Sequence, residues 1–169
     1  LQLEKDFPLT VINSKTTLSE LLEKGELDAI ISPEIPICFK KNNLNIGRLY
    51  ENFAEVEKEY FRRTGIFPIM HALGIREDIY VENPWLAEEL YNVFLESKNI
   101  AEQDLLETRA LKIGLPWLLE HVSETKKIMG KDIWSYGIKD NYATLQTSLN
   151  YVRDQGLADH QMEVEDLFV

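Results

Sequence analysis

The chain has 169 residues, of which 44% are hydrophobic and 28% are charged, and its formal net charge is −11. This composition is typical of a globular chain and excludes a disordered one, and the negative charge argues against non-specific binding to nucleic acid, which requires a cationic surface. Cys38 is the single cysteine, so an intrachain disulfide and a cysteine-rich zinc site are excluded, and no apolar run is long enough to predict a membrane span.

The first part of the chain is predicted to form a strand, a helix and a second strand. The apolar runs 9–13 and 28–32 are typical of buried strands. Between them, Thr17 and Glu20 match a capping box at the start of a helix that ends at Gly25. This order favours a parallel sheet. Since the first strand has no earlier strand to pair with, and no methionine or leader is visible, we expect the chain to be the C-terminal part of a longer protein.

A loop-like linker rich in proline and asparagine is predicted from Pro33 to Gly47, followed by an amphipathic helix. The apolar positions of this helix recur at spacings of four, three and four residues: Leu49, Phe53, Val56 and Tyr60. Its last turn carries Arg62 and Arg63, and Gly65 is a natural end. The apolar run 66–76 predicts a strand, which its internal proline restricts to an edge, a bulge or a start near Ile69.

The rest of the chain is predicted to be mostly helical. Asn83 and Pro84 match the cap and first residue of a long helix. Three further helices are expected at 104–113, at 116–129 and at 139–155, the last two ending at glycines. The strand–helix–strand unit is followed by segments that are not predicted to add further strands to it. This order suggests a two-lobed protein, in which the unit ends one lobe and the rest of the chain belongs to the other.

Several stretches resemble 4,5-dihydroxyphthalate decarboxylases and their close relatives. The longest is EKEYFRRTGIFPIMHALGIREDIYVENPWLAEELYNVF, and the others are LEKGELDAIIS, LPWLLEH, MGKDIWSYGIKDNYATLQTSLNYVRDQGL and EDLF. Their order is preserved, and they cover about the last half of such a protein. That family resembles type II periplasmic binding proteins, in which two α/β lobes enclose a ligand in the cleft between them.

The resemblance implies a fold and a division of the chain. We expect a partial copy of an α/β, type II periplasmic binding protein-like fold, with parallel-type sheets and a helical C-terminal segment. Residues 1–33 would end the second lobe, 34–65 would form a linker and crossover helix, and 66–169 would return to the first lobe and add the C-terminal helices.

The resemblance also implies an activity, the conversion of 4,5-dihydroxyphthalate or a similar aromatic dicarboxylate to protocatechuate and carbon dioxide. The reaction protonates the ring carbon that carries the departing carboxylate, so it requires a general acid, cations for the carboxylates and partners for the hydroxyls. We expect a small aromatic acid as the ligand, a cytoplasmic location, and neither an organic cofactor nor a metal.

Five residues are candidates for these roles. His71 is the candidate acid, because an imidazole exchanges protons near neutral pH and this one follows an apolar run. Arg62 and Arg63 are candidate carboxylate clamps, although adjacent helical residues diverge by about 100°. Ser32, at the end of a predicted strand, and Tyr60 are candidate substrate contacts. A structural histidine, arginines that stabilise the helix dipole and a core tyrosine are the alternative interpretations.

Two other functional classes stay open at this point. The first is a solute-binding protein that delivers a small anionic or aromatic molecule to an ABC-type transporter, which would be periplasmic. The second is a helical module that binds a partner through an exposed apolar stripe on the helix at 139–155. A homo-oligomer is compatible with each class. His121 and His160 are expected to have packing or surface roles.

Overall fold

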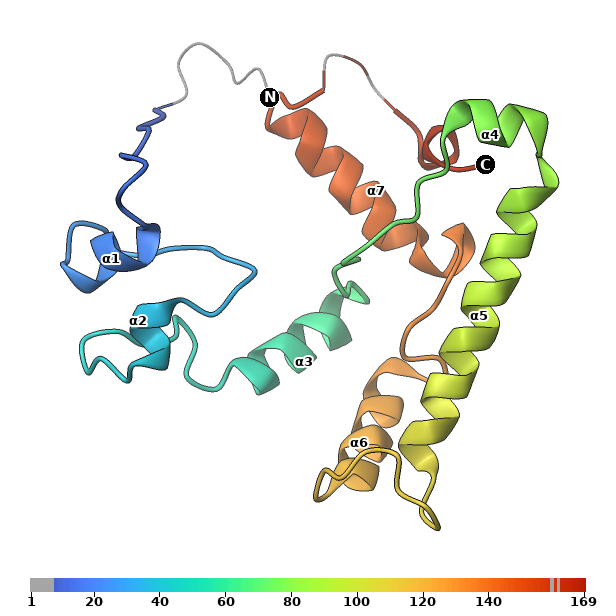
Figure 1. The fold of residues 1–169 in the computed structure, drawn as a ribbon, viewed down its shortest axis with the longest axis horizontal. Coiled ribbons are helices and arrows are strands. Elements are labelled where there is room, and N and C mark those ends of the chain that lie inside the picture. The colour runs from blue at the N-terminus through green and yellow to red at the C-terminus, as the bar shows by residue number, and fades with distance from the viewer. Residues whose placement is uncertain (1–7, 159, 161) are drawn as a thin grey trace. The chain divides into compact units, whose positions relative to one another are not determined.

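A computed structural model describes residues 8–158, 160 and 162–169. In these residues all regular secondary structure is helical, and Figure 1 accordingly draws coiled ribbons without arrows. The chain divides into two compact units, residues 1–57 and 58–169, which are treated separately below. No helix in the described part of the chain is long and apolar enough to cross a membrane.

Two short helices, α1 (Leu18–Glu23) and α2 (Ile37–Lys40), pack together in the first unit. The predicted capping box is confirmed, because the Glu20 N–H donates to Thr17 Oγ1 at 3.2 Å and the Thr17 N–H donates to Glu20 Oε2 at 3.1 Å. The two helices are joined where the Cys38 N–H donates to Ser19 Oγ at 3.0 Å. Cys38 is completely buried and forms the core of this small unit.

The helix α3 (Phe53–Thr64) begins in the first unit and ends in the second. The second unit continues with α4 (Glu77–Glu82), α5 (Trp85–Leu106), α6 (Leu118–Met129), α7 (Ile138–Asp154) and a short 3-10 helix, η1 (Val164–Leu167). The α5 helix packs against α4 and α6, and α7 packs against η1.

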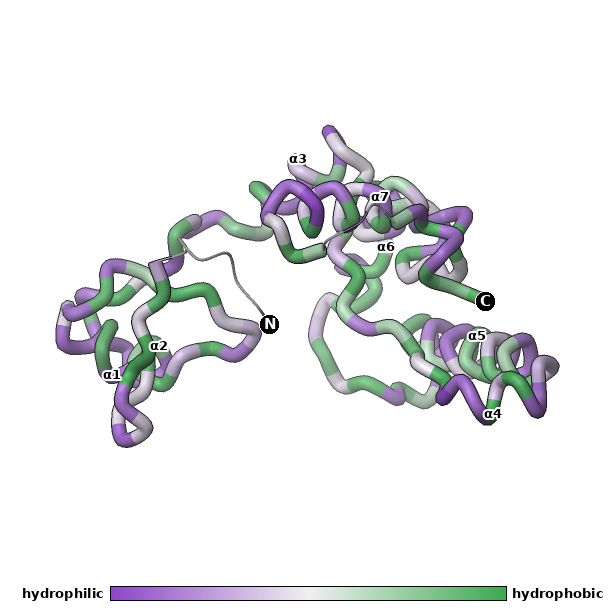
Figure 2. The backbone as a smooth tube through the Cα atoms, turned by 90° about the horizontal axis from the view of Figure 1, so that it is seen from above, coloured by the Kyte–Doolittle hydropathy of each residue, from purple (hydrophilic) through white to green (hydrophobic). Residues whose placement is uncertain are grey.

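Few hydrophobic side chains are buried among the described residues of the second unit. They are Val122 of α6, Leu149 of α7 and Val164 of η1. Hydrophobic and hydrophilic residues alternate along α4 and α5 (Figure 2). Apolar side chains such as Trp85 remain exposed. Polar contacts also join the elements of this unit, and those of Lys98 are the most extensive. Its ammonium group links α5 to the segment after α6, through Asp132 Oδ1 at 2.8 Å and the Trp134 carbonyl at 3.0 Å.

The predicted α/β fold with parallel sheets is wrong for this chain. The runs 9–13, 28–32 and 66–76 contain no strand, and they are largely exposed, with Val11 85% and Ile31 102% accessible. A strand exists only where a neighbouring strand pairs with its backbone N–H and C=O groups, and no segment of the described chain supplies that ladder. An apolar run can be read from the sequence, but its pairing partner is a property of the tertiary structure.

Several helix predictions also need correction. Asn83 does not cap the long helix; it ends α4, where its side-chain amide donates to the Ile79 carbonyl at 3.3 Å, and α5 begins after Pro84. The predicted helix at 104–113 is wrong because α5 ends at Leu106, and α2 and α4 were not predicted. The helices expected at 116–129 and 139–155 are confirmed as α6 and α7.

Candidate functional site

The predicted site residues fall in both units. Ser32 belongs to the first unit, whereas Tyr60, Arg62, Arg63 and His71 belong to the second. Within the second unit, the candidate arginines occupy the last turn of α3, and His71 lies in the extended segment that connects α3 to α4.

The two arginines point to different neighbours on their own helix. Arg62 Nη1 lies 3.3 Å from Glu59 Oε2, one turn back along α3. The Arg63 guanidinium lies over the Tyr60 ring, 5.6 Å from its centroid. Successive helical residues are rotated by about 100°, which explains why the two side chains diverge. Arg63 thus offers a guanidinium on an aromatic surface, and Arg62 one that is already paired with a carboxylate.

The segment that carries His71 starts at a well-defined helix end. The Thr64 hydroxyl donates to the Tyr60 carbonyl at 2.7 Å and accepts from the Ile66 N–H at 3.1 Å, and Gly65 has a φ of 66°. Phe67 then packs edge-on against Trp134, with 5.3 Å between ring centroids. Four residues later His71 is exposed, and its imidazole makes no hydrogen bond to any residue that the structure describes. Its nitrogens are therefore accessible to a ligand.

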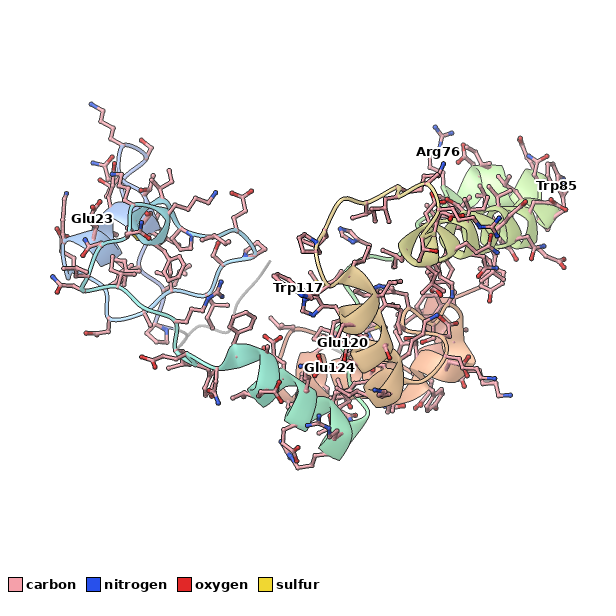
Figure 3. All side chains as sticks on the ribbon, turned by 90° about the horizontal axis from the view of Figure 1, so that it is seen from below. Glu23, Arg76, Trp85, Trp117, Glu120 and Glu124 are labelled. Atoms are coloured by element: carbon pink, nitrogen blue, oxygen red, sulfur yellow. The ribbon has the colours of Figure 1, made fainter. Side chains whose placement is uncertain are left out.

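A charged cluster lies between α3 and α6. Lys58 Nζ contacts Glu124 Oε1 at 2.7 Å, and Figure 3 shows Glu124 one turn after Glu120 on α6. The hydrogen bond from Lys58 and its charge, with smaller contributions from the charges of His121 and Arg62, hold the pKa of Glu124 below its ordinary value of 4.5. Arg62 is thus close enough to α6 to act on this carboxylate. His121, which was expected to have a packing or surface role, is exposed, and its charge also acts on this carboxylate.

The structure places Ser32 in a pocket of about 250 Å³ within the first unit. Residues 32–36, Phe39 and Arg48 line it. Ser32 Oγ accepts a hydrogen bond from the Glu34 N–H at 3.2 Å, which leaves the hydroxyl proton available for donation. A second cavity, beside α7, has a volume of about 20 Å³, which suits a single water and not an aromatic acid.

Arg48 is the residue of this pocket that the sequence interpretation missed. The chain reverses after α2 through Asn42, whose φ is 54°, and through Asn43, whose side chain accepts from the Asn45 N–H at 3.0 Å. The reversal places the Arg48 guanidinium 5.3 Å from the centroid of Phe39 and 4.4 Å from that of Phe53. The signal in the sequence was an arginine between two phenylalanines and next to a turn, which is weak by itself.

Among the residues that the structure describes, no three His, Cys, Asp or Glu side chains lie close enough together to hold a metal ion.

Comparison with known proteins identifies a relative. No protein-family model matches the chain. The chain is 34% identical over 152 residues to a 4,5-dihydroxyphthalate decarboxylase from Comamonas testosteroni. The aligned region covers 90% of this chain and 46% of that protein, so the chain spans about half the length of its relative. We conclude that the chain is related to a 4,5-dihydroxyphthalate decarboxylase.

Proposed function

We propose that the protein takes part in decarboxylation of 4,5-dihydroxyphthalate or a similar aromatic dicarboxylate, with protocatechuate and carbon dioxide as products. The observation that carries this proposal is the 34% identity, over nine-tenths of the chain, to a protein of that name. The structure adds two supporting features, an exposed imidazole at His71 and guanidinium groups that rest on aromatic rings.

The chemistry requires a proton for the ring carbon that loses its carboxylate. A hydroxyl para to this carbon pushes electron density toward it, and His71 delivers the proton to form a dienone-like intermediate. The bond between the ring and the carboxylate then breaks, carbon dioxide leaves, and the electron pair of that bond restores the aromatic ring. The net change is the replacement of one carboxylate by a hydrogen atom.

The other predicted residues have supporting roles in this proposal. Arg62 or Arg63 pairs with the carboxylate that stays on the ring, because a guanidinium fits a carboxylate with two parallel hydrogen bonds. Arg63 is the better candidate for this pairing, because the guanidinium of Arg62 already forms an ion pair with Glu59. The Tyr60 ring, 37% exposed beneath Arg63, contacts the substrate. The Ser32 hydroxyl belongs to the first unit and offers a hydrogen bond to a ligand of that unit's own pocket.

Turnover by the purified protein tests the proposal directly. 4,5-Dihydroxyphthalate is supplied, and protocatechuate is followed by absorbance and carbon dioxide by trapping. His71→Gln is expected to slow the reaction by about 10²–10⁴-fold, the contribution of a positioned general acid. His160→Gln, at an exposed position outside the proposed site, serves as the matched control and is expected to leave the rate unchanged. Binding of the substrate without any product would disprove the enzymatic function.

A further inference from the structure

We propose that the pocket of the first unit is a binding site for a hydroxylated aromatic carboxylate, with Arg48 as the anchor for the carboxylate and Glu34 as the acceptor for the ring hydroxyls. The inference rests on the proposed function for the identity of the ligand. Its evidence is separate and comes from the charges, aromatic contacts and volume of this pocket, to which neither His71 nor the α3 arginines contribute.

The Arg48 guanidinium contacts aromatic rings and has no acidic partner among the described residues. In the described part of the chain, no carboxylate forms an ion pair with this guanidinium, which contacts the rings of Phe39 and Phe53. By contrast, Arg76 and Arg153 each pair with a neighbouring aspartate. The Arg48 guanidinium lies over two rings and donates no hydrogen bond to any residue that the structure describes, so its N–H groups are available to an anion.

The other lining residues define the kind of anion. Phe39, Ile35 and Pro36 offer apolar surface for a ring, and the hydroxyl of Ser32 supplies a further donor in the same lining. Glu34 also lines the pocket, and an ionised carboxylate accepts hydrogen bonds but donates none. The Glu34 carboxylate would repel a ligand whose polar groups are all negatively charged. It favours a ligand that carries hydroxyl donors as well as a carboxylate.

The size of the pocket sets an upper limit for the ligand. Its volume of about 250 Å³ lies just below the range of roughly 300–1,000 Å³ that is usual for small-molecule sites. A single substituted ring fits such a space. The combination of one cation, one acceptor and an apolar wall therefore selects a monocyclic phenolic acid.

Three probes separate the two polar contacts. 3,4-Dihydroxybenzoate carries both the carboxylate and the hydroxyls, benzoate carries the carboxylate alone, and catechol carries the hydroxyls alone. Their dissociation constants are measured by calorimetry on the purified protein and on the variants Arg48→Gln and Glu34→Gln. Arg109→Gln, which removes an exposed arginine from a loop of the other unit, is the control for a general loss of positive charge.

The expected pattern is specific to each contact. Arg48→Gln should weaken 3,4-dihydroxybenzoate and benzoate by about tenfold or more, because a charge-assisted pair is lost, and should leave catechol within about twofold. Glu34→Gln should weaken catechol and 3,4-dihydroxybenzoate by about fivefold and leave benzoate equal or tighter. Arg48→Lys, which keeps the charge without the planar fork, should be intermediate.

Two outcomes would overturn the inference. One is an Arg48→Gln variant that binds both carboxylates with unchanged affinity. The other is an equal loss of all three probes in that variant, which would indicate a collapsed pocket. The result is independent of turnover: selective binding at Arg48 by a protein that releases no carbon dioxide would refute the proposed function alone. Turnover with an unchanged KM in Arg48→Gln would refute this inference alone.

Discussion

Replacement of Lys98 by methionine tests whether polar contacts hold the helices of the second unit together. The side chain of Lys98 is 8% exposed, and its ammonium group donates to Asp132 Oδ1 at 2.8 Å, to Asp132 Oδ2 at 2.9 Å and to the Trp134 carbonyl at 3.0 Å. It also lies 5.1 Å from the centroid of the Tyr136 ring. Lys98→Met keeps the length of the aliphatic stem and removes these interactions.

The loss in the free energy of unfolding depends on how well the former partners of Lys98 are satisfied in the variant. A hydrogen bond to a charged group contributes about 1.5–3 kcal/mol, but the three bonds of Lys98 do not simply add. Asp132 is 49% exposed, so water replaces the lost hydrogen bonds and reduces the contribution of Asp132 to the loss of stability. Glu102 Oε1 is buried without a hydrogen-bond partner among the described residues, and the Lys98 ammonium lies 4.0 Å from it. The variant removes the positive charge beside this carboxylate as well as the hydrogen bonds to Asp132 and Trp134, so the free energy of unfolding should fall by about 2–4 kcal/mol.

Urea denaturation followed by circular dichroism measures this change. Lys112→Met, in the exposed segment between α5 and α6, removes a charge of the same kind and is expected to change the free energy of unfolding by less than about 0.5 kcal/mol. A loss below about 1 kcal/mol in Lys98→Met, or an equal loss in the control, would show that the Lys98 contacts do not hold α5 to the segment after α6.

Two further substitutions test the charged cluster and a helix end. Because the pKa of Glu124 is lowered in the folded protein, its contribution to stability is complete above its ordinary value of 4.5 and is lost as the pH falls through the lowered value. Urea denaturation at about pH 6 and pH 3 should therefore show a smaller loss of stability on acidification in Glu124→Gln than in the unmodified protein, and equal losses would contradict the assignment. Gly130→Ala should lower the free energy of unfolding by about 1–3 kcal/mol, because Gly130 ends α6 at a φ of 96° and a ψ of −172°. Gly114→Ala, where φ is ordinary and space is open, is the control, and an equal effect at both glycines would contradict the backbone argument.

Local signals in the sequence predicted some of the helix ends. The capping box of Thr17 and Glu20 and the glycine that ends α6 involve groups within a few residues of each other, so their partners are already present in the sequence. Asn83 shows the limit of this reasoning, since the same residue type ends one helix just before another begins. An unrecognised α4 made its role ambiguous.

The candidate site was accessible to sequence reasoning only in part. The divergence of Arg62 and Arg63 follows from helix geometry, and the family resemblance agrees with the relative that comparison identifies. The roles of His71, Tyr60 and Ser32 stay predictions until turnover is measured. Arg48 was missed because neither periodicity nor a motif marks it. Its place over Phe39 depends on a turn that brings together residues nine positions apart.

The sequence by itself determined the start of α1 and the end of α6, because those ends depend on hydrogen bonds between near neighbours and on a glycine conformation. The tertiary structure alone decided whether the apolar runs 9–13, 28–32 and 66–76 are strands, because a strand requires a partner from elsewhere in the fold. It also decided which arginine meets a pocket. Arg48 stacks on rings from both sides of a chain reversal, and the energy of such contacts depends on positions in space that a linear pattern does not contain.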